Sequence, residues 1–262
     1  FLLLLIVPIS NISNLRLGPA WEGLNEFMTL FLLFFIITGI VDGFEKFRRL
    51  CWTLVICTAI IALNGVIQYI RGYDLIGTTP IVGRIRFIGI FGDPNDLALL
   101  INSFLPFILV NLFEKDTGGG KKLLSLAAGI LFMAAIYFTN SRGGFVALLV
   151  ILAYFSYRKW GLAKGIAIGG GFLAIGVILA PSRMGELSPY GRSAKGRVNA
   201  WIDGLVYLKS RPVFGIGFQQ FAIYHGRAAH SALVKCFAEL GVVGYFLWLS
   251  LIYSCFRGLR KI

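Results

Sequence analysis

Long apolar runs recur along this sequence, and they constrain its fold more than any other feature. A helix needs about 20 mostly apolar residues to span the hydrocarbon core of a bilayer. The 262 residues are 57% hydrophobic with a mean hydropathy of +0.79, which is unusual for a soluble domain. We therefore predict an all-α polytopic membrane protein with about seven transmembrane helices plus a truncated N-terminal one at 1–9. The predicted helices lie near residues 28–41, 50–70, 97–113, 123–139, 144–157, 165–180 and 232–256.

The first residues, FLLLLIVPIS, lack an initiating Met and a basic segment before the apolar stretch. They therefore do not have the form of a signal peptide. We expect that the chain begins inside a helix and that the full protein extends beyond both ends.

Basic residues outnumber acidic ones, with 25 Lys and Arg against 12 Asp and Glu. We do not expect nucleic acid as a partner, because these residues lie in short loops where they set the orientation of membrane helices. Alternate loops carry three Lys or Arg each, at 44–49, 114–122, 158–164 and 257–261. We assign those loops to the cytoplasm. The opposite side then receives residues 10–27, 71–96, 139–144 and 181–231.

The two sides differ in the kind of basic residue they carry. Each side has twelve, of which ten are Arg on the outer side and five on the cytoplasmic side. Arg pairs bidentately with phosphate, whereas Lys acts as a point charge. An anionic phosphate ligand outside the membrane is the interpretation we favour, and contact with lipid headgroups is the alternative.

The outer segment 181–231 is too long for a plain connection. Within it, residues 193–212 carry apolar side chains at the spacing of an amphipathic helix that lies on the membrane surface and ends at Pro212. These apolar residues are Val198, Trp201, Ile202, Leu205, Val206 and Leu208. We therefore divide the chain into transmembrane helices with short loops (1–180), an external loop (181–231), and a final transmembrane helix with a basic cytoplasmic end (232–262).

Two outer turns carry candidate ligand-binding side chains. The tight turn TNSRGG places Arg142 at the outer surface, where burial is costly unless an anion or carboxylate pairs with it. An Arg that only anchors a helix end is the alternative. In GRIRFIGIFGDPNDLALL, Arg84, Arg86 and Asn95 are further candidates, although helix capping explains much of the DPND turn.

The long outer segment supplies the remaining candidates. Arg197 lies near the start of the amphipathic helix, and Arg211 follows its end. We predict that Arg211 binds substrate together with Gly215 and Gly217 in the turn that follows it. His230 immediately precedes the last apolar run, where an imidazole can accept a proton from a hydroxyl nucleophile. A histidine at a helix start is more often a capping or interfacial residue.

Several other functions have less support. The four cysteines have no metal-ligand spacing, and we expect no disulfide, metal or cofactor. A small-anion transporter or channel is the main alternative, and Glu239 inside the last helix is the feature that favours it.

Four stretches occur in the order seen in the O-antigen ligase and O-antigen polymerase superfamily. They are GIFGDPNDLALL, TNSRGG, GRVNAWIDGL with SRPVFGIGFQQF, and HSALVKCFAELGVVG. The last resembles the family signature of His, a polar residue, nine residues, Gly, two residues and Gly. The resemblance covers roughly residues 80–250. Family members usually have about a dozen helices, which is more than the seven and a truncated one predicted for this chain.

The resemblance implies a metal-independent glycosyltransferase of the bacterial inner membrane whose active site faces the periplasm. Its donor would be a glycan on undecaprenyl diphosphate, and its acceptor a hydroxyl of lipid A core, protein or a growing polysaccharide, among surrounding membrane lipids. By the same resemblance, Arg142 and Arg197 match the arginines that hold the diphosphate. His230 matches the proposed base. A scaffold that only binds polyprenyl lipids is a further alternative, and it would keep the arginines and tolerate the loss of His230.

Overall fold

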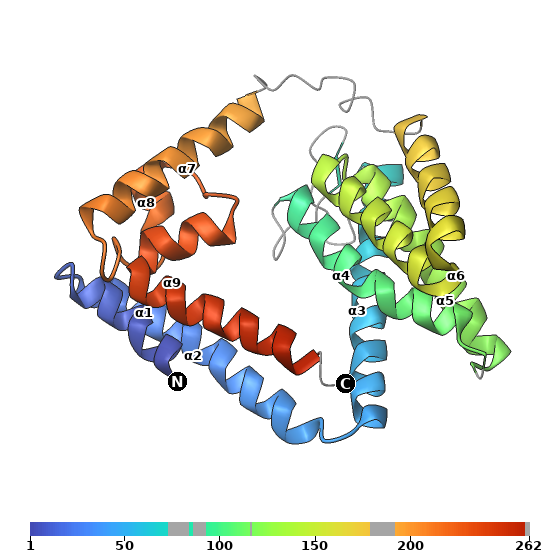
Figure 1. Cartoon of the computed structure of the whole chain (residues 1–262), viewed down its shortest axis with the longest axis horizontal. Helices are drawn as coiled ribbons and strands as arrows, with labels where there is room; N and C mark the ends of the chain where they lie inside the picture. Colours follow the sequence, from blue (N-terminus) through green and yellow to red (C-terminus); the bar gives the residue numbers. More distant parts are fainter. Residues whose placement is uncertain (73–83, 86–92, 116, 179–191, 260–262) are drawn as a thin grey trace. The chain divides into compact units, whose positions relative to one another are not determined.

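We analysed a computed structural model of the chain, which describes residues 1–72, 84–85, 93–115, 117–178 and 192–259 (Figure 1). Every element of regular secondary structure in these ranges that has more than one residue is a helix. The helices are α1 (Leu2–Ile12), α2 (Leu17–Ile40), α3 (Phe44–Arg71), α4 (Pro94–Phe113), α5 (Gly119–Phe138), α6 (Arg142–Ile178), α7 (Arg192–Ser210), α8 (Phe221–His225) and α9 (Ala232–Leu259).

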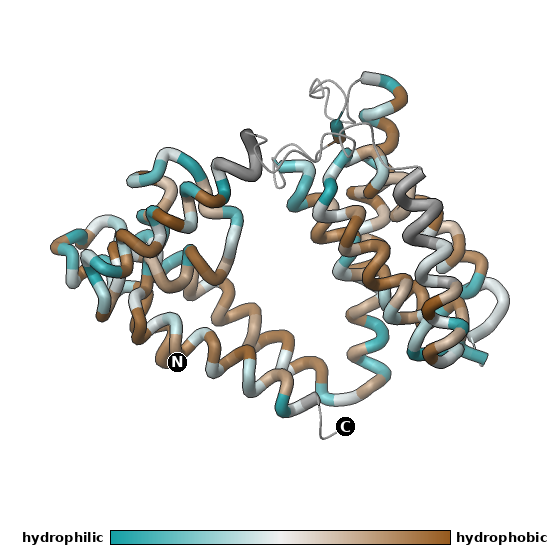
Figure 2. The backbone as a smooth tube through the Cα atoms, turned by 45° about the horizontal axis from the view of Figure 1, so that its top comes forward, coloured by the Kyte–Doolittle hydropathy of each residue, from teal (hydrophilic) through white to brown (hydrophobic). Residues whose placement is uncertain are grey.

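Six of the described helices are long and apolar enough to cross a membrane, and α1 is a shorter apolar helix. The spans lie in α2, α3, α4, α5, the first part of α6 and α9. Large apolar side chains are exposed along them, for example Phe34 on α2 and Val150 on α6, and the helices are mostly hydrophobic along their length (Figure 2). The prediction of an all-α polytopic membrane protein is thus confirmed.

Helix α6 contains two of the predicted transmembrane segments, 144–157 and 165–180, of which residues 179 and 180 lie outside the described ranges. The two helical stretches are joined at Gly161, whose φ of 81° and ψ of 176° are not helical. A Cβ on Gly165 would lie 2.5 Å from the Tyr157 Cα, and one on Gly169 would lie 3.0 Å from the Ala153 Cβ. The two stretches therefore pack as an antiparallel hairpin, with small residues at the contact as in many membrane helix pairs.

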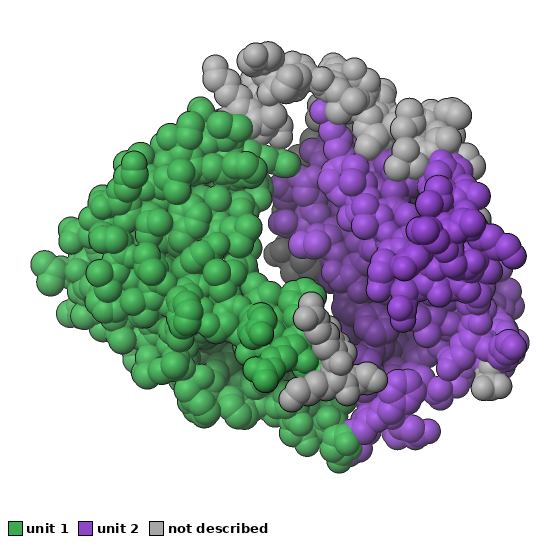
Figure 3. Space-filling model, viewed as in Figure 1, with its two compact units in different colours: residues 1–42, 188–262 green, residues 43–187 purple. Residues whose placement is uncertain are grey.

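The chain forms two compact units, which Figure 3 shows in different colours. Unit 1 consists of residues 1–42 and 188–262, and unit 2 of residues 43–187. The structure describes each unit by itself.

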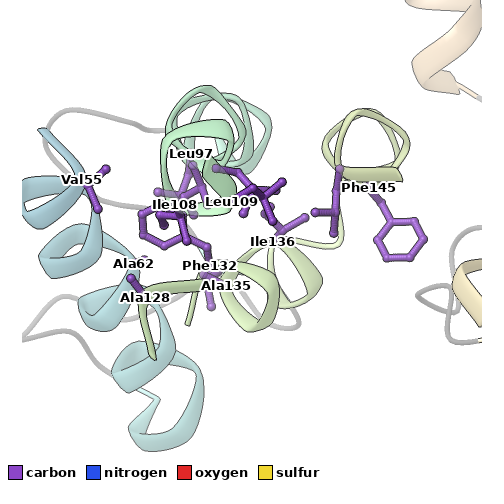
Figure 4. Close-up of a cluster of buried hydrophobic side chains, with 14 residues drawn as sticks. Val55, Ala62, Leu97, Ile108, Leu109, Ala128, Phe132, Ala135, Ile136 and Phe145 are labelled. Carbon is purple, nitrogen blue, oxygen red and sulfur yellow. The ribbon is translucent and has the colours of Figure 1, made fainter. Parts of the chain in front are cut away.

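In unit 2, α5 packs against α3 and α4, and α4 also packs against α6. Helix α4 contributes a buried stripe that includes Leu97, Ile101 and Leu105, spaced as one face of a helix. Phe132 of α5 is fully buried and lies near Ile108 and Leu109 of α4 (Figure 4). This core holds the starts of α4 and α6 together.

In unit 1, α9 packs against α1 and α7. Two apolar clusters join these helices. One contains Ile6 and Val7 of α1 with Cys236 and Leu240 of α9. The other consists of Ala200, Phe221, Ala229, Val234 and Ala238.

The predicted amphipathic helix forms α7, which ends at Ser210, two residues before Pro212. Its buried face includes the small residues Ala200 and Gly204, and Tyr207 beside them is partly buried. Its opposite face carries the predicted apolar stripe, and five of the six residues are about half exposed: Val198, Trp201, Ile202, Leu205 and Val206. The sixth, Leu208, is partly buried.

Candidate functional site

In unit 2, the turns that precede α4 and α6 contact each other. Ser141 Oγ donates a hydrogen bond to Asn95 Oδ1 at 2.7 Å, and Asn95 Nδ2 donates to Asp93 Oδ1 at 2.8 Å. Asp93 caps α4 by accepting from Asn95 N, also at 2.8 Å. Ser141 caps α6 in the same way, because its Oγ accepts from Gly144 N at 3.1 Å. Asn95 therefore links two helix starts.

Arg84 joins this cluster from the preceding segment. Its Nε donates to Thr139 O at 3.0 Å, and Ile85 N donates to Phe138 O at 3.2 Å. Arg142 is the first residue of α6 and is partly exposed. Unit 2 therefore brings Arg84, Asn95 and Arg142 to one turn. Guanidinium charge and a helix N-terminus are both features that favour an anion. Arg86 lies outside the described residues.

The two glycines after Arg142 have different surroundings. A Cβ on Gly144 would overlap the Ala98 Cβ of α4, whereas a Cβ on Gly143 would meet nothing within 4 Å. Asn102 Nδ2 also donates to Gly144 O at 2.9 Å. Gly144 thus permits close packing of α4 on α6, and Gly143 has open space beside it.

We expect Gly144→Ala to destabilise unit 2 by about 1–3 kcal/mol, because the added methyl group overpacks the α4–α6 contact. Gly143→Ala is the matched control and should be neutral or slightly stabilising, since alanine favours a helix. Thermal unfolding of both variants in detergent would measure the difference. Equal unfolding temperatures would contradict the close contact at Gly144.

In unit 1, residues 212–217 run alongside a break in α9. Gly241 interrupts that helix with a φ of 65° and a ψ of −167°. The freed backbone groups pair across the break: Ile216 N donates to Ala238 O at 2.9 Å, and Val242 N donates to Pro212 O at 2.9 Å. The segment that follows Arg211 is therefore tied to the middle of the final transmembrane helix.

Glycine is required on both sides of this contact. A Cβ on Gly215 would overlap the backbone of Glu239, and a Cβ on Gly241 would overlap the backbone of Val213. A Cβ on Gly217 would overlap Asn11 Oδ1 of α1. The predicted substrate-binding glycines, Gly215 and Gly217, are both buried. Their surroundings provide a packing reason for the absence of a side chain.

Glu239 has a defined partner in the same region. Its side chain is 2% exposed, and Oε1 accepts a hydrogen bond from Phe221 N at 3.0 Å. The carboxylate therefore fastens the start of α8 to α9.

His230 lies two residues before the start of α9 and is exposed. Its φ of 49° is in the left-handed region, which is uncommon for residues other than glycine and costs free energy. Ser231 follows as a cap, with its Oγ accepting from Val234 N at 3.4 Å and its carbonyl from Lys235 N at 3.0 Å. Ala229 on the other side is buried. The backbone on both sides of the exposed imidazole is thus held in place.

Arg197 and Arg211 are also exposed in unit 1, at the beginning and just after the end of α7. Neither guanidinium forms an ion pair with a described residue. Guanidinium groups of this kind can pair with an anionic ligand.

Sequence reasoning missed a second histidine. His225 Nδ1 lies 2.6 Å from Asp203 Oδ2, which joins the end of α8 to α7. The two residues are 22 positions apart, and no motif or spacing links them. The shape of the fold alone brings them together.

No group of three or more His, Cys, Asp or Glu side chains that could hold a metal ion occurs within the described ranges. All four cysteines, Cys51, Cys57, Cys236 and Cys255, are free thiols.

Comparison with protein families gives a match for residues 127–249, which correspond to the family described as O-antigen ligase. The matched segment is similar to this family. It runs from α5 into α9 and covers slightly less than half of the chain. The matched segment includes Arg142, Arg197, Arg211, Gly215, Gly217 and His230, whereas Arg84, Arg86 and Asn95 precede it. Neither a curated protein nor a solved structure matches the chain significantly.

Proposed function

We propose that this O-antigen ligase-like chain transfers a glycan from undecaprenyl diphosphate to an acceptor hydroxyl on the periplasmic side of the bacterial inner membrane. The family match supports a membrane glycosyltransferase at family level. The observation that carries the finer proposal is His230, an exposed imidazole on a constrained backbone at the start of α9. Exposed arginines without a described carboxylate partner lie in the same unit.

The direction of three helices supports a common side of the membrane for the candidate residues. Helix α4 begins beside Asn95, the first stretch of α6 begins at Arg142, and α9 begins after His230. Each of these helices runs toward a basic loop, at 114–122, 158–164 or 257–261. By the positive-inside rule those loops are cytoplasmic, so the helix starts are periplasmic. The segment 181–231 is then the external loop of the domain division proposed above, and the exposed stripe of α7 contacts the membrane surface.

The mechanism is a single displacement. His230 takes the proton from the acceptor hydroxyl as its oxygen attacks the anomeric carbon of the donor sugar. The bond from that carbon to the diphosphate oxygen breaks, and undecaprenyl diphosphate leaves with the bonding electrons. We assign Arg142 and Arg197 to the diphosphate, as the family resemblance implies, since guanidinium groups stabilise its growing negative charge. Arg84, Arg86, Asn95 and Arg211 are further candidates for donor binding. These steps require a base and a leaving group that is stable as an anion, and they require no metal or cofactor.

Transport of a small anion has less support than transfer. The feature that favoured it was Glu239, and this carboxylate has a structural partner in Phe221 N. A buried acid that holds two elements together does not by itself indicate a transport pathway.

The function is tested by a transfer assay with full-length protein in membranes. Labelled undecaprenyl diphosphate glycan is supplied with lipid A core, protein and oligosaccharide acceptors in separate reactions. We expect label to move to at least one acceptor class, and membranes without the protein provide the background. If no acceptor is labelled while the protein conducts small anions in a flux assay, the transporter would replace this proposal.

A further inference from the structure

The contact between His225 and Asp203 is a polar link between two helices. The side chains are 13% and 43% exposed, respectively, and their Nδ1–Oδ2 distance is 2.6 Å. A carboxylate only accepts hydrogen bonds, so the imidazole must carry its proton on Nδ1. A doubly protonated imidazole would donate from the same atom. The contact therefore forms in both charge states of His225.

The surroundings keep this link away from bulk water on one side. The Phe221 ring lies 5.5 Å from the His225 ring and 5.6 Å from the Tyr207 ring. Burial and the nearby charge of Asp203 raise the pKa of Tyr207, which agrees with a carboxylate held close to this helix face. Arg16 also contacts α8: it donates to Oε1 of Gln220, the N-cap residue, at 2.7 Å and lies over the Tyr224 ring. Helix α8 is therefore fastened from two directions.

Only five residues, 226–230, connect His225 to Ser231, the cap of α9. Gly226 ends α8 in the left-handed conformation with a φ of 75°, and its N donates to Ala222 O at 2.9 Å. Ala229 is 1% exposed and packs in the cluster with Ala200 and Phe221. Residues 226–230, which we name the His230 segment, are thus anchored at both ends. The His225–Asp203 contact lies directly before Gly226, at the first of these two ends.

We propose that the Asp203–His225 pair is a positioning element that holds α8 against α7 and thereby fixes the His230 segment. The effect on catalysis rests on the proposed function, in which His230 is the base. The anchoring of the segment rests only on the contacts described above. A general base works only within hydrogen-bonding reach of the proton it removes. A displacement of about 1 Å can lower a rate by about 10²-fold. Fixing the segment therefore affects the rate of transfer more than the binding of the lipid donor.

The test compares Asp203→Ala, Asp203→Asn and Asn199→Ala in the full-length protein. Alanine removes the acceptor, whereas asparagine keeps a carbonyl oxygen at the same place. Asn199 is an exposed polar residue one turn away on α7 and serves as the matched control. Hydrogen–deuterium exchange of the peptide covering the His230 segment and the kinetics of glycan transfer are measured for each variant. Both are measured at one pH, and thermal unfolding checks that each variant is folded.

We expect exchange in the His230 segment to become about tenfold faster in Asp203→Ala, as for the loss of one charge-assisted hydrogen bond. The kcat for transfer should fall about 10- to 100-fold, with the KM for the lipid donor nearly unchanged. Asp203→Asn should recover most of both properties, and Asn199→Ala should resemble wild type. If Asp203→Ala does not accumulate as folded protein, His225→Gln replaces it.

Two results would overturn the proposal. One is unchanged exchange in the His230 segment after the acceptor is removed, which would show that the pair does not hold it. The other is faster exchange with an unchanged kcat, which would show that the segment needs no fixing. Failure of the proposed function is distinguishable, because exchange can be measured in a protein that transfers no glycan. Faster exchange in Asp203→Ala together with full activity of His230→Ala would retain the anchoring and reject His230 as the base.

Discussion

His230→Ala is expected to lower the rate of glycan transfer by about 10²- to 10⁴-fold, the usual contribution of a positioned general base. Binding of the lipid donor should remain close to that of wild type, because we assign the diphosphate to arginines and not to this imidazole. The exposed side chain makes few contacts that its removal would disturb. The loss should therefore appear in kcat, with labelled donor in membranes as the substrate and retained lipid measured in parallel.

A matched variant separates the loss of a base from a disturbed helix start. Leu233→Ala changes an exposed side chain in the first turn of α9 and should keep most of the activity. Normal turnover by His230→Ala would exclude His230 as the base.

Gly241→Ala is expected to have the largest effect on stability, about 3 kcal/mol or more. The φ of 65° and ψ of −167° at this residue belong to a backbone region that is almost confined to glycine. A methyl group would also overlap the Val213 carbonyl. To relieve the overlap with Val213, residues 212–217 would have to move away from α9. That movement would break the Ile216 N–Ala238 O and Val242 N–Pro212 O hydrogen bonds.

Gly39→Ala is the matched control for this prediction. Gly39 lies near the end of α2, and a Cβ there meets nothing within 4 Å. Thermal unfolding in detergent should show a large decrease for Gly241→Ala and little change for Gly39→Ala. Limited proteolysis should show new cleavage between Arg211 and Phe221 only in Gly241→Ala. An unfolding temperature close to that of wild type would mean that the break in α9 does not require glycine.

Most of the helices could be predicted from the sequence, because the patterns that indicate a helix are local. Apolar runs of sufficient length predicted the spans of α3, α4, α5 and α9. The spacing of Val198, Trp201, Ile202 and Leu205 predicted α7. The basic residues at 158–164 predicted a turn between two helices, 144–157 and 165–180. Both lie within α6, and the chain reverses between them at Gly161. The order of four short motifs indicated the ligase family that the match at 127–249 supports.

The contacts within the candidate site could be predicted only in part from the sequence. Arg84, Asn95 and Arg142 were identified separately, but their convergence at the turn before α6 requires α4 and α5 to pack side by side. The Gly215 and Gly217 pair looked like a loop near a ligand, yet both glycines lie against backbone or side chains of other helices. The roles of these residues in donor binding remain part of the proposal.

The sequence by itself determined where the long apolar helices lie and which loops carry positive charge, although α2 begins at Leu17 and α3 at Phe44, ahead of the predicted 28 and 50. Those properties depend on hydropathy, helical periodicity and capping within a few neighbouring residues. Only the tertiary structure decided that Gly215 lies against Glu239, that Ser141 bonds to Asn95, and that Asp203 holds His225. Each pair joins positions that are far apart in the chain, and close packing of helix backbones brings them together.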